Sequence, residues 1–367
     1  MADTKYTMIG MTSAGKTCYI TAMYMKMSAG FDGFTLVTDD LTRAKLERDI
    51  LTLREPKGQE RFPTATNETT TRSYEFKLSY ETKKIITFEM LDYAGGLLRS
   101  RGIPITQADE TIEGNSKPQV KETITANPYE QIKNSIAEST ALYIFVDGKS
   151  FCTDDREERK ENVYYDCAMT VTPLIQDFAD THGGNLPPIV FVVTKADLCK
   201  QYVSSEEIAT VIKDLFSPAF SEGTYSYICA VSLGDTISDD EYKGRFRPVN
   251  IHIPFFIGSY HEYYNRCVVL KNDIESGNAN LSREKRTADS SAAKELSRWR
   301  IFRDEAYIER CRRQARDAEN ALKSNQALLD STKDLFYKFG ARLEAESPNF
   351  KCFINGIEQS RFKGFNL

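Results

Sequence analysis

The sequence predicts an α/β fold: a mostly parallel, six-stranded sheet with helices on both faces, followed by an antiparallel coiled-coil hairpin of two helices. Two observations predict it. Short apolar segments of strand length alternate with segments of helix length through most of the chain, which is typical of a parallel sheet covered on both faces. In the last third, apolar residues recur at every seventh position between charged flanks, which is typical of a coiled coil.

The expected strands are short apolar segments bounded by polar or glycine-rich residues. They are residues 5–10, 74–80, 85–91, 141–146, 188–194 and 225–231. Helices are expected between them, at residues 16–29, 127–140, 157–184 and 204–216. Ser204 and Glu207 have the spacing of a capping box, and Gly30 is placed to end the first helix.

The last third of the chain carries the sevenfold repeat, which consists of Ile301, Ile308, Ala315, Leu322, Leu329, Phe336 and Leu343. It predicts one helix over about 254–285 and a longer antiparallel partner over about 290–346, with Asp304, Asn325 and Thr332 interrupting the apolar seam. An Asn-Gly pair at 355–356 predicts a β-hairpin in the tail. The expected domains are therefore residues 1–253, a helical extension at 254–347 and a short β-hairpin tail at 348–367.

The bulk composition excludes several classes of protein. The net charge of -5 does not favour nucleic acid as the main partner, and no apolar segment has the length of a membrane span. The eight cysteines are dispersed and form no C-x-x-C pair, which indicates a reducing compartment. We therefore expect a cytoplasmic protein.

The sequence GMTSAGKT at residues 10–17 matches the Walker A pattern G-x-x-x-x-G-K-[ST] between an expected strand and an expected helix. In such a loop the backbone N–H groups hold phosphates, the lysine neutralises the β- and γ-phosphates, and the hydroxyl binds Mg²⁺. The residues predicted to hold the nucleotide here are Gly10, Ser13, Ala14, Gly15, Lys16, Thr17 and Cys18.

Three further motifs follow expected strands, so they should meet the phosphate loop at one rim of the sheet. In DYAGG, Asp92 is a candidate Mg²⁺ ligand and Gly95 a candidate N–H donor to a γ-phosphate. TKAD spans Thr194, Lys195 and Asp197, and its carboxylate is suited to accept two hydrogen bonds from guanine. The backbone near Ser232 and Leu233 is then placed to reach the guanine O6.

These four stretches in this order resemble the Ras-like, translation-factor-related P-loop GTPases, especially bacterial members. The resemblance implies a G domain over residues 1–253, with inserts at 38–62 and 97–126, that binds GTP or GDP with Mg²⁺. An extra helix is expected in the first insert. The resemblance also implies a first-switch threonine as a further Mg²⁺ ligand; the FPTAT sequence favours Thr66, and Thr64 and Thr69 remain alternatives.

Two positions depart from the family pattern. Gly96 stands where efficient members often carry glutamine, and Thr194 replaces the more usual asparagine. We therefore expect slow hydrolysis, on the order of 10⁻⁴ to 10⁻² s⁻¹ without help. Arg99 and Arg101 are close enough in sequence to act as arginines in cis, although an ordinary solvated loop is the simpler interpretation.

The main functional hypothesis is a GTP-hydrolysing switch that signals to a protein partner through its switch loops and helical arm. A nucleotide-binding scaffold with negligible hydrolysis is the alternative, because of Gly96. An ATP-using P-loop enzyme is a third reading, against which Lys195 and Asp197 argue. Self-association through the arm is a further expectation.

Overall fold

The computed structural model describes residues 4–55, 61–63, 71–93, 95, 128–235, 237, 244–297, 305–365 and 367. The chain divides into two compact units. The first unit consists of Met1–Gly258 and Ala345–Phe362, and the second of Ser259–Glu344 and Lys363–Leu367.

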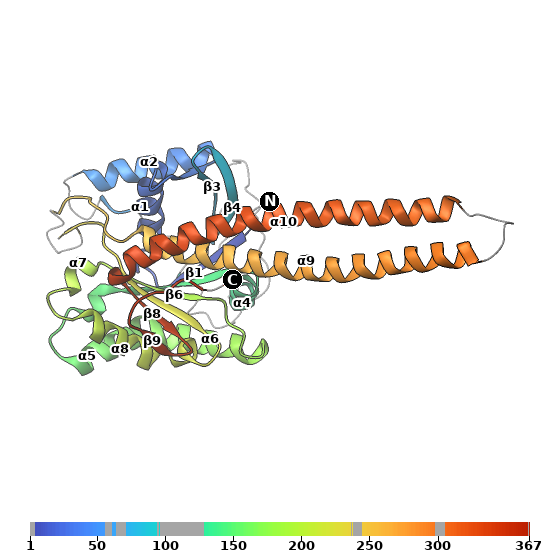
Figure 1. The fold of residues 1–367 in the computed structure, drawn as a ribbon. Coiled ribbons are helices and arrows are strands. Elements are labelled where there is room, and N and C mark those ends of the chain that lie inside the picture. Colours follow the sequence, from blue (N-terminus) through green and yellow to red (C-terminus); the bar gives the residue numbers. More distant parts are fainter. Residues whose placement is uncertain are drawn as a thin grey trace, which may run out of the picture. The chain divides into compact units, whose positions relative to one another are not determined.

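The first unit is built on a sheet whose strand order is β2-β3-β4-β1-β5-β6-β7-β8-β9. Figure 1 labels strands β1, β3, β4, β6, β8 and β9 of this sheet. The strands are β1 (Thr4–Gly10), β2 (Phe34–Thr38), β3 (Arg72–Tyr80), β4 (Lys83–Asp92), β5 (Ala141–Asp147), β6 (Ile189–Thr194), β7 (Tyr225–Ala230), β8 (Phe350–Ile354) and β9 (Ile357–Gln359). The five central strands, from β4 to β7, are parallel, and the outer strands join them antiparallel. The α/β class is as expected, but the prediction of six strands was wrong, because the sheet contains nine strands within the residues that the structure describes.

The three extra strands lie at the two edges of the sheet. The segment forming β2 is only five residues long, and its side chains alternate between buried Leu36 and exposed Val37, as an edge strand allows. The tail hairpin turns at Asn355 and Gly356, which have φ of 54° and 70°, and its first strand pairs with β7. The predicted hairpin is therefore present and extends the main sheet.

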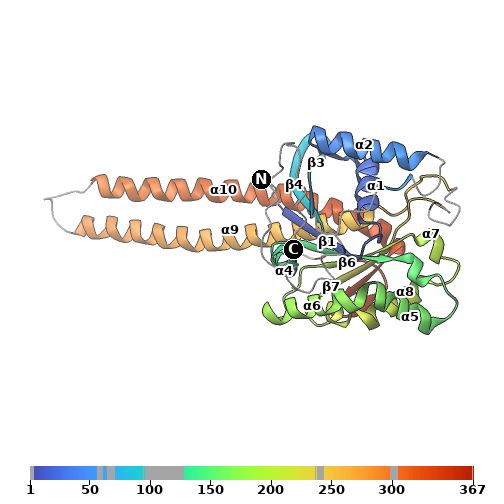
Figure 2. The same cartoon turned by 180° about the vertical axis from the view of Figure 1, so that it is seen from behind.

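Helices cover both faces of the sheet, as Figures 1 and 2 show from opposite sides. The helices that the structure describes are α1 (Lys16–Ser28), α2 (Asp40–Arg54), α4 (Pro128–Ala137), α5 (Arg156–Val163), α6 (Met169–Thr181), α7 (Ala196–Cys199), α8 (Ser205–Leu215), α9 (His252–Ser297) and α10 (Glu305–Glu346), of which most of α9 and α10 belongs to the second unit. Helices α1 and α2 lie on one side of the sheet, and α5, α6 and α8 on the other. Helix α2 occupies the segment where an extra helix was expected.

The two faces of the sheet bury different side chains. Aliphatic residues dominate beneath α4, α5, α6 and α8, whereas aromatic rings fill the face beneath α1. On this second face Phe88 of β4 lies 5.3 Å from the ring of Tyr6 and 5.1 Å from that of Phe255, in the first turns of α9. The start of α9 is therefore part of the core of the first unit, because all three rings are fully buried.

The segment 157–184, expected as one helix, is interrupted. A π-helical turn at Tyr164–Ala168 separates α5 from α6, and Pro173 lies inside α6. Since proline cannot donate the backbone hydrogen bond of an α-helix, strain from such a residue must be absorbed locally. The wider turn begins nine residues before Pro173.

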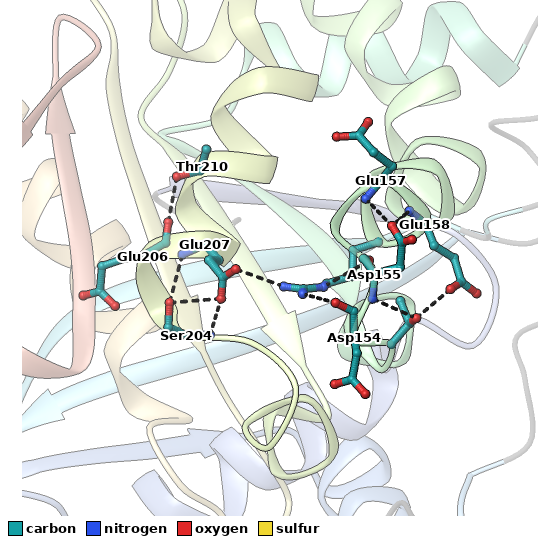
Figure 3. Close-up of polar contacts among 10 residues, drawn as sticks. Asp154, Asp155, Glu157, Glu158, Ser204, Glu206, Glu207 and Thr210 are labelled. Carbon is teal, nitrogen blue, oxygen red and sulfur yellow. Dashed lines mark hydrogen bonds and ion pairs between the residues drawn. The ribbon is translucent and has the colours of Figure 1, made fainter.

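Asp155 at the beginning of α5 and Glu207 at the beginning of α8 are labelled in Figure 3. The buried Arg159 joins these two helix ends. The guanidinium of Arg159 donates to the carbonyl oxygens of Asp154 and Asp155 and, at 3.3 Å, to Glu207 of α8. Glu207 is also part of the predicted capping box, in which it exchanges hydrogen bonds with Ser204. At the start of α5, Asp155 accepts from the N–H groups of Glu157 and Glu158, so both helices begin with a side-chain cap.

The second unit contains the expected antiparallel pair of helices (Figure 2). Tyr260 of α9 stacks on Phe336 of α10 with ring centroids 4.7 Å apart, and Gly277 lies against Leu322 farther along both helices. Thr332 is buried in the seam, as predicted, and its hydroxyl donates to the Leu328 carbonyl at 2.7 Å. Helix α9 ends at Ser297, so the boundary expected near residue 285 was too early.

Among the helices that the structure describes, none combines the length and the apolar character that crossing a membrane requires.

Candidate functional site

The predicted site residues lie where the central strands end. In the sheet, β1 lies between β4 on one side and β5 on the other. The carboxyl end of β1 is therefore the point at which the strand order reverses direction. Ligands of open α/β sheets bind at such a point, outside the carboxyl ends of the strands. Gly10–Thr17 runs from the end of β1 into α1, and Asp92 is the last residue of β4. Thr194–Asp197 runs from the end of β6 into α7, and Ser232 follows β7.

The loop between β1 and α1 has the backbone geometry of an anion-binding site. Ser13 and Gly15 adopt left-handed conformations, with φ of 67° and 86°, on either side of Ala14. Alternation of right- and left-handed residues turns successive N–H groups toward one point, which forms a concavity for anions. Helix α1 starts at Lys16 without a side-chain cap, so its first N–H groups have no side-chain acceptor in the described structure.

Lys16 is buried within this loop, with only 7% of its surface exposed. Its Nζ donates to the carbonyl oxygens of Gly10 at 2.7 Å and Met11 at 3.2 Å, and lies 4.0 Å from Asp92 Oδ1. Burial lowers the pKa of the Lys16 ammonium, although the charge of Asp92 opposes the shift. A desolvated ammonium held this way gains strongly from a nearby polyanion.

Asp92 is fully buried at the end of β4. Burial raises the pKa of its carboxyl group, while Lys16 and a 3.3 Å hydrogen bond from the Thr17 hydroxyl oppose the shift. Its Oδ1 accepts no hydrogen bond from any residue that the structure describes. An orphaned buried carboxylate oxygen beside a threonine hydroxyl fits the oxygen ligands that Mg²⁺ prefers, so the residues present suit this ion.

Gly95 lies directly against the phosphate loop. A Cβ built on it would stand 2.1 Å from the backbone nitrogen of Thr12 and 2.5 Å from the carbonyl carbon of Met11. Because no side chain could occupy that space, a glycine is required at this position. The D-x-x-G segment and the Walker A loop are therefore in contact through their backbones.

The loop after β6 also touches the phosphate loop. The Thr194 hydroxyl donates to the Ala14 carbonyl at 3.0 Å, and Lys195 Nζ donates to the Ser13 carbonyl at 3.1 Å. Lys195 has a left-handed backbone with φ of 49°, a strained conformation for a residue with a side chain. These contacts bring the two predicted nucleotide motifs together, 180 residues apart in sequence.

A backbone hydrogen bond joins the segments that carry Asp197 and Ser232. The N–H of Ala196 donates to the Val231 carbonyl at 3.1 Å, which attaches the start of α7 to the loop after β7. Both Asp197 and Ser232 are 8% exposed, whereas Leu233 is half-buried. Cys18, in the first turn of α1, is half-buried too.

Asp147, at the end of β5, is a site residue that the sequence reasoning missed. Its Oδ2 pairs with Lys195 Nζ, and its Oδ1 accepts from the Lys149 N–H at 2.9 Å. The signal available in the sequence was its place directly after the strand 141–146, at the same rim as the other motifs. Asp147 thus fixes the direction of the Lys195 side chain toward the phosphate loop.

Replacing Asp147 with asparagine is expected to weaken binding of guanosine diphosphate about tenfold, since Lys195 loses one charged partner while the turn at Lys149 keeps its acceptor. Equilibrium binding of labelled nucleotide to the full chain measures the effect. Asp154→Asn removes the same charge from an exposed side chain and is the matched control. Equal affinities of the two variants would exclude a role for the Asp147–Lys195 pair.

Several predicted residues lie outside the described residues. These are Thr66, with its alternatives Thr64 and Thr69, and also Gly96, Arg99, Arg101 and the insert at 97–126. Among the residues that the structure does describe, no group of three or more histidine, cysteine or acidic side chains is arranged to hold a metal ion.

No protein-family model matches the chain, and a search of curated proteins finds no significant match.

Proposed function

We propose that this chain is a P-loop GTPase of the Ras-like type: a switch that binds GTP or GDP with Mg²⁺ and hydrolyses GTP slowly. In this proposal Gly10–Cys18 hold the phosphates, Thr194–Asp197 recognise guanine, and the backbone at Ser232 and Leu233 reaches the base from the other side. Lys16, Thr17 and Gly95 are the candidate catalytic groups around the γ-phosphate, together with Thr66.

One observation carries the proposal: the candidate phosphate loop and the candidate base loop are in direct contact. Thr194 and Lys195 donate to consecutive carbonyl oxygens of the Walker A loop, those of Ala14 and Ser13. A single nucleotide must touch both its phosphate and its base motif, so the two motifs have to be neighbours. Their contact supports a common ligand, whereas either motif alone would be weak support.

The charges near the phosphate loop agree with a magnesium-bound polyphosphate. Thr17 and Asp92 are the residues that would hold Mg²⁺. When bound, this ion neutralises phosphate charge and so favours transfer of the γ-phosphoryl group to water. Lys16 would exchange its carbonyl contacts for phosphate oxygens, and the Gly95 N–H would lie close to the phosphate loop.

Exposed apolar side chains on the second unit are the reason for proposing it as a contact surface for a protein partner. Val269 of α9 and Leu328 and Tyr337 of α10 are each more than half exposed, although they lie on a coiled-coil pair. A contiguous exposed apolar patch marks a protein-interaction surface, and these three side chains are exposed apolar residues from which such a patch on the arm would be built. We therefore propose the helical arm as the surface that contacts the partner. The partner is either another protein or a second copy of this chain.

The nucleotide that purifies with the full chain tests the proposal. Acid denaturation followed by ion-exchange chromatography should release GDP or GTP in near-stoichiometric amount. If the protein purifies empty, filter binding of tritiated GDP in the presence of Mg²⁺ is the second measurement. Release of an adenine nucleotide, or no saturable binding of GDP at millimolar concentration, would overturn it.

Hydrolysis separates the switch from its alternative, a nucleotide-binding scaffold that Gly96 favours. Single-turnover phosphate release from the GTP-loaded chain is expected on the order of 10⁻⁴ to 10⁻² s⁻¹ and should increase when a partner supplies the missing group. Thr17→Ala is the control that reports background release. A rate equal to that control, with and without cell extract, would favour the scaffold.

A further inference from the structure

Arg61 is a buried cation that belongs to none of the motifs above. It lies in the described segment 61–63, between α2 and β3, and only 2% of its surface is exposed. Its Nε and Nη2 donate to the carbonyl oxygen of Leu53 at 3.1 and 2.6 Å. Its Nη1 donates at 2.7 Å to the carbonyl oxygen of Gly244, which is 183 residues away in sequence.

The first of these contacts caps a helix. Leu53 is in the last turn of α2, where backbone carbonyls have no partner within the helix and carry the negative end of its dipole. A guanidinium with two donors on one such oxygen satisfies it and stabilises the helix end. Since Leu46 and Leu53 are themselves buried, α2 is packed into the core, and Arg61 is bonded to a helix that is itself held in place.

The second contact reaches the loop that holds the candidate base site. Gly244 begins a segment that runs beside Ser232–Gly234: the Arg247 N–H donates to Leu233 at 2.7 Å, and the Val249 N–H donates to Ser232 at 2.9 Å. A Cβ on Gly234 would stand 2.0 Å from the Arg245 carbonyl oxygen, so the two backbones touch. Arg61 thus holds Gly244, and the residues that follow Gly244 contact the backbone proposed to meet guanine O6.

We propose that Arg61 is a positioning residue that couples α2 to the base-binding loop and thereby slows the release of guanine nucleotide. The proposal rests on the proposed function, because it concerns the same site. A forked guanidinium suits this role, since it can donate to two carbonyls in different directions and stays charged when buried. Loss of the contact would leave residues 244–249 free to move with the base loop and so would lower the barrier to dissociation.

The test is the dissociation rate of tritiated GDP from the full chain in the presence of Mg²⁺. Arg61→Gln is expected to accelerate release about tenfold, the size associated with one charge-assisted hydrogen bond. Arg61→Lys keeps the charge but reaches one carbonyl at a time. Its GDP release rate should therefore lie between that of the unmodified chain and that of Arg61→Gln. Arg43→Gln removes the same charge from an exposed arginine of α2, paired with Asp40, and should release GDP like the unmodified chain.

A second readout separates this coupling from a cap confined to α2. Amide hydrogen exchange of the nucleotide-free chain reports on the Arg247 N–H, which is bonded to Leu233. Coupling predicts faster exchange there in Arg61→Gln. A purely local cap predicts faster exchange only in α2, together with an unchanged GDP release rate.

The outcomes are distinguishable. Unchanged release from Arg61→Gln, or from Arg61→Lys if the glutamine variant does not fold, overturns the role of Arg61 while leaving the proposed function intact. Absence of GDP binding by the unmodified chain overturns the proposed function itself.

Discussion

Replacing Lys16 with alanine is expected to abolish tight nucleotide binding, with a loss of at least about 100-fold in affinity for GDP. The ammonium is buried, and its present partners are two carbonyl oxygens and the carboxylate of Asp92. A phosphate chain at this loop would form its strongest single interaction with that charge, because both are shielded from water. Equilibrium binding of tritiated GDP measures the loss.

Two controls make this result specific. Lys5→Ala removes a lysine from the other end of β1, where it pairs with Glu138, and should bind GDP normally.

Removing Lys16 also leaves Asp92 buried without its cation, which destabilises the fold whatever the ligand. The double variant Lys16→Ala/Asp92→Asn relieves that charge, so it should melt close to the unmodified chain and still fail to bind. Tight binding of GDP by Lys16→Ala or by the double variant would exclude the Walker A loop as the phosphate site.

Asp197→Asn is expected to change the preferred base from guanine to xanthine. Affinity for GTP should fall at least about 100-fold, and affinity for xanthosine triphosphate should rise. A carboxylate accepts from both N–H groups on one edge of guanine. An asparagine amide instead donates to the carbonyl that xanthine carries at that position. Asp197 is buried at the start of α7, whose Ala196 N–H is bonded to the loop after β7, so its direction is constrained.

Competition of GTP, xanthosine triphosphate and ATP against labelled GDP measures this preference in one assay. The matched control is Asp235→Asn, which removes an exposed carboxylate that pairs with Lys200 in the neighbouring loop. The control should keep the preference for guanine. GTP affinity that is unchanged in Asp197→Asn contradicts the base assignment, and ATP binding that neither variant alters would favour an adenine-using enzyme.

The elements with strong local signals could be predicted well. The capping box at Ser204 and Glu207 is present as expected, and Gly30 follows the end of α1. The seam of α10 faces α9 where the sevenfold repeat predicted it, at Leu329, Phe336 and other positions. Such patterns are readable because helix periodicity, caps and Asn-Gly turns depend on residues a few positions apart.

The site was predictable only in part. Each motif follows a strand, so its place at the rim of the sheet could be inferred from the sequence. The contacts that organise the rim could not, since they join residues far apart in the chain. Asp147 holding Lys195 and Arg61 holding Gly244 are examples: neither carries a motif, and an aspartate or arginine in a loop has no distinctive sequence signal.

By itself the sequence determined the α/β class, the chemistry available at each loop and the antiparallel helical pair, since periodicity and spacing encode these locally. Only the tertiary structure decided the sheet edges, the break between α5 and α6, and the convergence of the phosphate and base loops. The physical reason is the same in each case: strand pairing and buried ion pairs are chosen by competition among distant partners. That competition is resolved only when the whole chain packs.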